Sequence, residues 1–383
     1  MTDIHGWTAA GFDGVRDAFA ANFETADEVG AAFSAYHRGR KVVDLWGGVA
    51  DQATGRPWEE DTVVLVFSTT KAPTAVCAHR LAEDGHLDLE APVATYWPEF
   101  AAAGKENLPV SYLLSHQAGL AWIDGTMSLE EALAWEPVVE RLAAETPKWE
   151  PGTAHGYHAT TYGWLVGEVV HRIDGRSLGT YFHDEVAAPL GLDFWIGTPE
   201  SVEPRVAPLV TFDLPSDGPA RDLMDQFMGP DTKLGRALTA PGGAFADFTV
   251  FNSRAVRAAE VPAANGVTDA RSLAKMYAAL VGEADGIRLL GPKQVELAAT
   301  QRTSGPNIVL MDMDIQFGLG FMVPSTLMPA EPGSFGHFGA GGSVGWADPT
   351  AELGMGYVMN RMDIGLAGDL RSANLFASVY ESL

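Results

Sequence analysis

Segments with strand character stand at both ends of the chain, and mostly helical segments fill its middle. Near the N-terminus, the β-prone runs 29–36 and 41–46 surround a short glycine-bearing turn, which predicts a hairpin. Near the C-terminus, the strands expected are 315–323, 334–347 and 353–360. Because both ends supply strands, we expect one antiparallel sheet assembled from both termini, with a helical unit inserted between them.

The fold class predicted is therefore α+β, in two interleaved domains. Residues 1–85 plus 265–383 are expected to form an α/β domain around the sheet, and residues 86–264 a mostly helical inserted domain. The predicted helices are 11–24, 130–144, 161–173, 178–188, 270–281 and 368–382. Within the inserted domain, 199–243 is rich in proline, aspartate and glycine, which predicts a long surface excursion.

The charge balance limits the partners of the chain. It carries 25 Lys and Arg against 50 Asp and Glu, a formal net charge of −25 at pH 7. Such an excess of negative charge argues against nucleic acid or an anionic membrane as a partner. No segment approaches the roughly 20 consecutive apolar residues of a membrane-spanning helix.

Two further features bear on the cellular compartment. Cys77 is the only cysteine, which excludes intrachain disulfides and disfavours a thiolate metal site. Residues 1–7 lack the basic start and the apolar core of a secretory signal. From the lack of such a signal we expect a cytoplasmic protein.

The segment with the clearest chemical meaning is S-T-T-K, which begins at Ser68 and ends at Lys71. It follows the apolar run 63–67 and opens an alanine-rich segment that is typical of a helix. Residues i and i+3 of a helix share a face, so Ser68 Oγ and Lys71 Nζ are expected within hydrogen-bond reach. A lysine whose pKa burial lowers well below about 10.4 can act as the base that activates a serine. The alternative is a capping serine followed by a surface lysine.

A second serine lies in a motif of another kind. Ser343 stands in G-G-S-V-G, which matches the G-x-S-x-G nucleophile elbow of α/β-hydrolases. That motif needs a helix directly after the serine, and an acid and a histidine further along the chain. Here a turn at 348–349 follows, and His337 is the last histidine of the sequence. We therefore predict that Ser343 is not a nucleophile.

Two more segments supply parts that a Ser68 nucleophile needs. Tyr157 lies on a loop just before the helix predicted at 161–173. A tyrosine beside a lysine ammonium can have its pKa lowered toward the phenolate and relay the serine proton, although a packed tyrosine with a satisfied hydroxyl is the alternative. Residues 336–342 are expected to form a strand with almost no side chains after Phe338, where a ligand can accept from backbone N–H groups.

Together these segments resemble the serine β-lactamase and penicillin-binding superfamily, in particular class C β-lactamase-like proteins and family VIII carboxylesterases. Ser68 and Lys71 match S-x-x-K, Tyr157 stands in the place of Y-x-N, and 337–339 (H-F-G) stands in the place of K-T-G. The segment 113–120 also matches L-L-S-H-x-x-G-L, and the resemblance spans almost the whole chain. It implies a β-lactamase/transpeptidase-like fold, with helices flanking the antiparallel sheet.

The resemblance also implies roles for individual residues. Ser68 would be the acylated nucleophile, and Lys71 and Tyr157 the proton-transfer pair. The N–H groups of Ser68 and Ala340 would form the oxyanion hole. The substrate-binding residues expected are His337, Phe338, Gly339, Trp346 and His158. No cofactor and no metal are expected.

Two positions depart from the β-lactam-processing members. Ala159 stands where the asparagine of Y-x-N contacts the acylamino group of the substrate. His337 stands where the lysine of K-T-G attracts a carboxylate, and a histidine is largely neutral at pH 7 unless its pKa is raised. We therefore predict a serine carboxylesterase that cleaves uncharged esters of small, short-chain acids.

Other interpretations stay open. The same Ser-Lys-Tyr site would serve a β-lactamase, a D-amino-acid peptide or amide hydrolase, or an acyltransferase. An inactive binding protein of this fold is an alternative of another class. The partner expected is a small-molecule ester, with no nucleic acid and no membrane, and the oligomeric state is open, with a homodimer as one option.

The remaining histidines have plainer interpretations. His155 and His158 are spaced i, i+3, but no acidic or cysteine partner stands nearby, so we expect them to line the site or to be structural. His116 follows a serine, yet the resemblance assigns its segment to a structural turn. Trp346 is a candidate for lining an acyl or alcohol pocket.

Overall fold

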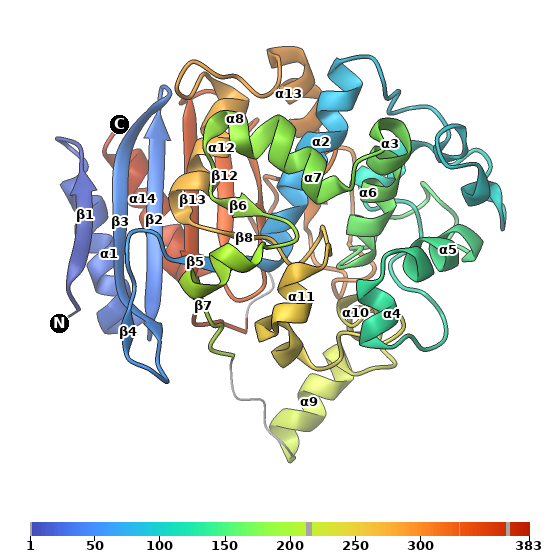
Figure 1. Cartoon of the computed structure of the whole chain (residues 1–383), viewed down its shortest axis with the longest axis horizontal. Helices are drawn as coiled ribbons and strands as arrows, with labels where there is room; N and C mark the ends of the chain where they lie inside the picture. The colour runs from blue at the N-terminus through green and yellow to red at the C-terminus, as the bar shows by residue number, and fades with distance from the viewer. Residues whose placement is uncertain (1, 212–216, 329, 365–367) are drawn as a thin grey trace.

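The two ends of the chain meet in one antiparallel sheet, as the strand patterns predict. In the computed structural model, which describes residues 2–383 except 212–216, 329 and 365–367, the strand order is β1-β3-β2-β13-β12-β11-β10-β9, with β4 beside β3. Figure 1 shows the blue N-terminal strands beside the orange and red C-terminal ones. The bounds are β1 Ile4–Thr8, β2 Gly30–His37, β3 Arg40–Asp51, β4 Arg56–Pro57, β9 Gln316–Phe317, β10 Met322–Val323, β11 Phe335–Phe338, β12 Val344–Asp348 and β13 Leu353–Met359.

Two predicted C-terminal strands are each a pair of shorter strands. The segment 315–323 divides into β9 and β10, and 334–347 divides into β11 and β12, with antiparallel pairing in both cases. Glycines cause both divisions, because Gly320, Gly341 and Gly342 have φ values of 90°, 86° and 121°, in or near the left-handed region that glycine tolerates. The glycine-rich segment after Phe338 is therefore a turn and not a continuing strand.

The helices of the sheet side lie on both of its faces. Their bounds are α1 Asp13–Thr25, α2 Lys71–Glu83, α12 Ala270–Val281, α13 Pro292–Ala299 and α14 Leu370–Glu381. Helix α12 packs across β2, β12 and β13, while α1 and α14 pack on each other against the opposite face (Figure 1). The close approach of α12 depends on strand glycines: a Cβ on Gly354 would lie 2.3 Å from the backbone nitrogen of Ala278.

The middle of the chain is mostly helical. Its helices are α3 Val110–Leu114, α4 Leu129–Leu133, α5 Glu136–Ala144, α6 Thr161–Asp174, α7 Leu178–Phe182, α8 Ala188–Leu190, α9 Pro219–Met228, α10 Lys233–Leu238 and α11 Arg254–Ala258. Short 3₁₀ turns are η1 Phe67–Thr70, η2 Val93–Thr95, η3 Pro98–Ala101, η5 Glu200–Arg205 and η6 Phe248–Asn252, and η4 His183–Ala187 is a π-helical turn between α7 and α8. The predicted helix 130–144 is two helices, because Trp135 has a φ of 65°.

A small second sheet leads into the candidate site. Its order is β6-β8-β5-β7, with bounds β5 Val63–Leu65, β6 Phe194–Trp195, β7 Val206–Ala207 and β8 Val267–Thr268. Strand β5 ends just before η1 and α2, which carry Ser68 and Lys71. Helix α2 packs against α6 and α7, so it lies between the sheet and the helical part. The domain boundaries given above stay a prediction.

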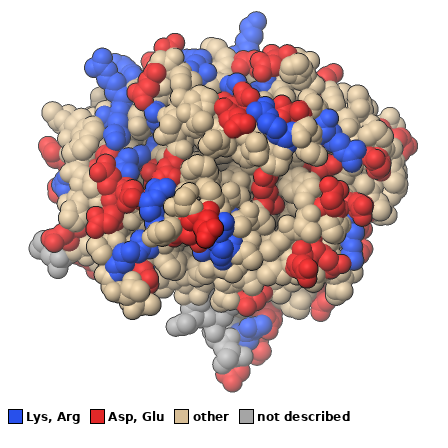
Figure 2. Space-filling model, in the orientation of Figure 1, with Lys and Arg blue, Asp and Glu red and all other residues tan. Residues whose placement is uncertain are grey.

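The excursion predicted at 199–243 contains η5, β7, α9 and α10, and its residues 212–216 lie outside the described part of the chain. Among the described residues, no helix combines the length and the apolar character needed to cross a bilayer. Figure 2 shows acidic side chains spread over one face of the molecule, with lysine and arginine side chains scattered among them.

Candidate active site

Ser68 lies at a sharp turn between β5 and α2. Phe67, directly before it, has a φ of 43°, a left-handed conformation that costs free energy for a residue with a Cβ. Thr70 Oγ1 donates to the carbonyl of Phe67 (2.5 Å) and accepts from the N–H of Gly266 (2.9 Å). The Phe67 ring packs edge-on against Phe251 at 4.9 Å. These contacts hold the turn, and Lys71 begins α2 as the sequence pattern predicts.

Lys71 is completely buried and its amino group contacts Ser68. Lys71 Nζ lies 3.0 Å from Ser68 Oγ, 2.6 Å from the carbonyl oxygen of Ala159 and 3.0 Å from that of Ala263. Burial lowers the pKa of Lys71 well below its usual value. A neutral amine has two N–H groups and one lone pair, and carbonyl oxygens can only accept. When the amine is neutral, the two carbonyls take both N–H groups and the lone pair faces the Ser68 hydroxyl.

Ala263 is a functional position that sequence reasoning missed. It contributes only a backbone carbonyl, and its loop is closed by Asn265, whose side chain donates to Val256 O (2.8 Å) and Ala259 O (2.6 Å). On the facing helix α6, a Cβ on Gly163 would lie 2.7 Å from the Ala263 nitrogen, so glycine is needed there for the loop to approach. A residue that acts only through its backbone carbonyl cannot be recognised from its side chain in a sequence.

Tyr157 lies beside this pair. Its ring centroid is 4.8 Å from Lys71 Nζ, and the ring stacks on Phe317 at 5.9 Å. Its backbone N–H donates to Asn307 Oδ1 (3.1 Å). Burial raises the pKa of Tyr157, and a hydrogen bond with the Ser68 side chain opposes this only in part. The expected shift toward phenolate is therefore wrong: the tyrosine is a neutral phenol, because burial disfavours its charged form.

The turn between β11 and β12 is fastened to the Ser68 segment. Gly339 N–H donates to Ser343 O (2.7 Å), Ser343 Oγ donates to Val66 O (2.9 Å), and Ser343 Oγ lies 3.1 Å from Thr69 Oγ1. A Cβ on Gly339 would lie 2.2 Å from Val66 O, so only glycine fits. Ser343 is buried with its hydroxyl engaged in these bonds, which fits the prediction that it is not a nucleophile.

Ala340 lies in this turn, half-buried. Within the part of the chain that the structure describes, no hydrogen bond engages the Ala340 N–H. A backbone N–H without an internal partner, next to the segment that carries Ser68, is what an oxyanion hole requires. The geometry is thus that of a serine and a base on one segment and a backbone donor on another.

The Beta-lactamase family model matches residues 15–377. The chain belongs to the beta-lactamase family. It is 39% identical over 360 residues to "Esterase/beta-lactamase LipL" of Mycobacterium tuberculosis, covering 90% of this chain and 80% of the relative. A crystal structure of a family VIII carboxylesterase is 40% identical, with a TM-score of 0.89 and 100% of both chains covered. A penicillin-binding protein homologue from Caulobacter crescentus is 38% identical, with a TM-score of 0.88 and the same coverage.

In this beta-lactamase family member, the residue in place of the K-T-G lysine carries no charge. His337 is fully buried, and its Nδ1 lies 2.7 Å from Phe338 O. Because that oxygen can only accept, the proton is on Nδ1, and Nε2 is left as a buried acceptor without a partner among the described residues. Burial, with Lys71 adding to it, lowers the pKa of His337 to about 3.

Phe338 and Trp346 lie on the other face of the sheet. Their rings are 5.9 Å apart, and with Phe376 and Tyr380 of α14 they line a cavity of about 430 Å³. That cavity is lined by none of Ser68, Lys71 and Tyr157. Side chains alternate between the faces of a strand, so Phe338 points away from the face that His337 occupies. The structure does not bring the two aromatic side chains to Ser68, contrary to the substrate-binding role expected for them.

The other expected histidines are structural. His158 is fully buried, accepts from the N–H of Leu120 at Nε2 (2.9 Å) and has Nδ1 2.7 Å from Gly156 O, so neither ring nitrogen is free for a substrate. The expected substrate contact of His158 is therefore wrong. Its backbone N–H donates to His116 Nδ1 (3.1 Å), and His155 Nε2 lies 3.2 Å from Ile315 O. Burial lowers the pKa of all three rings.

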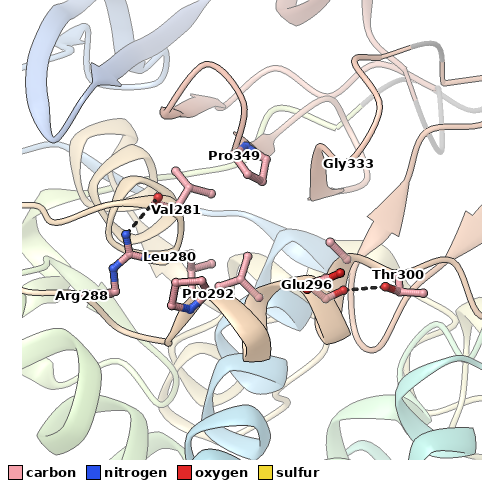
Figure 3. Close-up of a pocket in the computed structure, with 10 residues that line it drawn as sticks. Leu280, Val281, Arg288, Pro292, Glu296, Thr300, Gly333 and Pro349 are labelled. Atoms are coloured by element: carbon pink, nitrogen blue, oxygen red, sulfur yellow. Dashed lines mark hydrogen bonds between the residues drawn. The ribbon is translucent and has the colours of Figure 1, made fainter.

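A second cavity, of about 440 Å³, lies away from the candidate site. Figure 3 shows its lining, with Leu280 and Val281 of α12, Pro292 and Glu296 of α13, and Pro349 from the turn between β12 and β13. Arg288 at its rim donates to Val281 O (3.4 Å). The lining contains none of Ser68, Lys71 and Tyr157, so the cavity is not part of the candidate active site.

Proposed function

We propose that the protein hydrolyses carboxylic esters of small, short-chain acids through an acyl-enzyme on Ser68. The observation that carries the proposal is the contact of 3.0 Å between Ser68 Oγ and the buried amine of Lys71, whose pKa burial lowers well below its usual value. Similarity to a family VIII carboxylesterase and to a relative named as an esterase/beta-lactamase supports ester hydrolysis among the activities of the family.

In the first step the Ser68 proton moves to Lys71 Nζ as Ser68 Oγ attacks the ester carbonyl carbon. The negative charge that develops on the carbonyl oxygen is stabilised by the N–H groups of Ser68 and Ala340. The bond from the carbonyl carbon to the alcohol oxygen then breaks. The proton passes from Lys71 through the Tyr157 hydroxyl to the leaving alcohol, and the acyl group stays on Ser68.

In the second step a water molecule attacks the acyl carbon while Lys71 and Tyr157 accept its proton. The bond from the acyl carbon to Ser68 Oγ breaks, and Ser68 Oγ regains a proton. Because Tyr157 is a neutral phenol, it accepts one proton as it gives up another and never needs to hold a full negative charge. No metal or cofactor takes part in this scheme.

The choice of an uncharged substrate rests on His337 and Ala159. A lysine in place of His337 would attract a carboxylate, whereas the pKa of His337, lowered to about 3, leaves the ring neutral at pH 7. Ala159 offers no side-chain amide, and its carbonyl is already used by Lys71. Both features favour a neutral ester over a β-lactam carboxylate.

The test compares one p-nitrophenyl ester of a short-chain acid with one chromogenic cephalosporin. We expect kcat/KM for the ester to be at least about 10²-fold higher than for the cephalosporin. The cephalosporin would lack one charged contact at His337 and one polar contact at Ala159. Faster cephalosporin hydrolysis would favour the β-lactamase alternative. Transfer of the acyl group to an added alcohol would identify an acyltransferase.

A fluorophosphonate probe separates an enzyme from an inactive binding protein. The wild-type protein should be labelled, Ser68→Ala should not, and Ser343→Ala should stay labelled as the matched serine control. Labelling that persists in Ser68→Ala would contradict the assignment of the nucleophile. The cytoplasmic location stays a prediction, which cell fractionation against marker enzymes of each compartment would test.

A further inference from the structure

A group of buried charges lies directly behind the turn that carries Ala340. It consists of Glu28, between α1 and β2, Tyr357 of β13, Asp369 at the start of α14, and Arg371 in the first turn of that helix. We call it the Arg371 group. All four residues are buried, and they lie on the face of the sheet opposite to α12.

Arg371 uses its whole guanidinium within this group. Its Nε donates to both Asp369 oxygens (3.1 and 3.0 Å), and one Nη donates to Glu28 Oε1 (3.2 Å) and to Arg361 O (3.0 Å). The other Nη donates to Asp369 Oδ2 (2.6 Å) and to the carbonyl of Gly341 (2.8 Å). The guanidinium is planar and its donors have fixed directions. The carboxylates that bind it therefore also fix the position of the Gly341 carbonyl.

The turn needs such an anchor because of its backbone. Gly341 and Gly342 have φ values of 86° and 121°, and glycine carries little intrinsic preference that would hold them there. A Cβ on Gly342 would lie 2.2 Å from Asp369 Oδ2 and 2.7 Å from an Nη of Arg371, so the turn rests directly on the ion pair. The N–H of Asp363 also donates to Gly341 O (3.0 Å).

The other side of the turn is fixed by the Ser68 segment. Ser343 Oγ donates to Val66 O, and Gly342 N–H donates to Gly339 O (3.1 Å). Ala340 thus stands between one anchor made by Ser343 and one made by Arg371, while its own N–H has no acceptor among the described residues. An oxyanion donor must be aimed before the reaction, since catalysis is lost when it has to reorganise.

We propose that Arg371 is a positioning residue that aims the Ala340 N–H at the oxyanion of the reaction, by holding the Gly341 carbonyl from behind. The inference rests on the proposed function of Ser68. It makes α14, the last helix of the chain, part of the catalytic support, although Arg371 itself touches neither Ser68 nor the substrate.

The decisive variant is Arg371→Lys, which keeps the positive charge and loses the fork. An ammonium on Asp369 and Glu28 cannot also hold Gly341 O in the same geometry. We expect kcat for the p-nitrophenyl ester to fall about 10- to 100-fold, because a displaced oxyanion donor costs somewhat less than a deleted one, and KM to stay within about twofold.

Tyr357→Phe is the matched control. It removes the hydroxyl that bonds Glu28 in the same buried group and leaves the bond between Arg371 and Gly341 in place. We expect a similar loss of thermal stability and a kcat within about twofold of wild type. Equal kcat losses in both variants would reduce Arg371 to a structural role, and an unchanged kcat in Arg371→Lys would overturn the inference.

Two further readouts keep the result decisive. Asp369→Asn, which loosens the fork while keeping a side-chain oxygen for the helix cap, should show the same loss of kcat to a smaller degree. The rate of fluorophosphonate labelling also depends on the oxyanion hole, because the phosphoryl oxygen occupies it. If the wild type turns over no ester, the proposed function fails. The labelling rates still test the positioning role: slower labelling of Arg371→Lys than of Tyr357→Phe supports it, and equal labelling contradicts it.

Discussion

Lys71 and Lys105 are both completely buried, yet the two sites give their amino groups different surroundings. Lys105 Nζ donates to three backbone carbonyls, those of Ala102 (2.8 Å), Ala143 (3.0 Å) and Glu145 (2.5 Å). Lys71 Nζ has two carbonyls, and its third neighbour is the Ser68 hydroxyl. Three carbonyls match the three N–H groups of an ammonium at Lys105, whereas the third neighbour of Lys71 is a hydroxyl, which can donate as well as accept.

The difference explains how one fold uses the same residue type for structure and for chemistry. Burial lowers the pKa of Lys105 to about 8, and the charge of Glu145 opposes this shift. Burial alone lowers the pKa of Lys71, well below its usual value. Lys105 therefore stays mostly protonated at pH 7 and ties loops together, while the lowered pKa of Lys71 suits it to act as a base.

The largest effect is expected from replacing each lysine by methionine. Lys71→Met should lower kcat/KM for the ester at least about 10³-fold, because no base remains for the Ser68 proton. Lys105→Met should keep most of the activity and lose about 2–4 kcal/mol of unfolding free energy, because three buried carbonyls lose their donor. Steady-state kinetics and urea denaturation of both variants give the comparison. If Lys105→Met lowered kcat/KM as much as Lys71→Met, the two lysines would not differ in function as described.

Tyr157→Phe should have the next largest effect. The ring and its stacking on Phe317 remain, so thermal stability should stay close to wild type. Loss of the hydroxyl removes the proton relay, and we expect kcat to fall about 10²-fold. A variant that retains wild-type kcat would show that Lys71 passes the proton to the leaving group without Tyr157.

The smallest effect concerns acid stability. The pKa of His337 and that of His158 are both lowered to about 3, against an ordinary value near 6.5. Below about pH 6.5 the unfolded chain binds these protons and the folded chain does not, so each histidine destabilises the fold by up to about 1.4 kcal/mol per pH unit as the pH falls toward 3. Urea denaturation at pH 7, 6 and 5 should show a shallower decline for His337→Asn than for wild type. Parallel curves would mean that His337 has the same pKa in the folded and the unfolded chain, which would contradict its lowered pKa.

The sequence was informative where chemistry follows from local spacing. The i, i+3 spacing of Ser68 and Lys71 predicted their contact, and the order of motifs excluded Ser343. Strand patterns at both ends predicted the shared sheet. Each of these inferences needs only a neighbouring segment or the order of residues along the chain.

Other features depend on packing between distant segments and could not be predicted. The second acceptor of Lys71 is the carbonyl of Ala263, far along the chain and without any side-chain signal. The direction of the Tyr157 pKa shift depends on how dry the packing around it is. Phe338 and Trp346 are expected at the substrate from their places in and after the H-F-G triplet, but the alternation of side chains in the hairpin turns both toward α14.

We expect Lys71 to be a neutral amine at the working pH, and a direct titration of its amino group tests this state. Lysine labelled with ¹³C at Cε can be followed by NMR as the pH is raised, with Lys71→Arg identifying the resonance. We predict that this resonance titrates well below the value of about 10.4 that is usual for lysine, in parallel with the rise of kcat/KM. A Lys71 resonance that titrates near 10.4, with full activity at pH 7, would contradict the account.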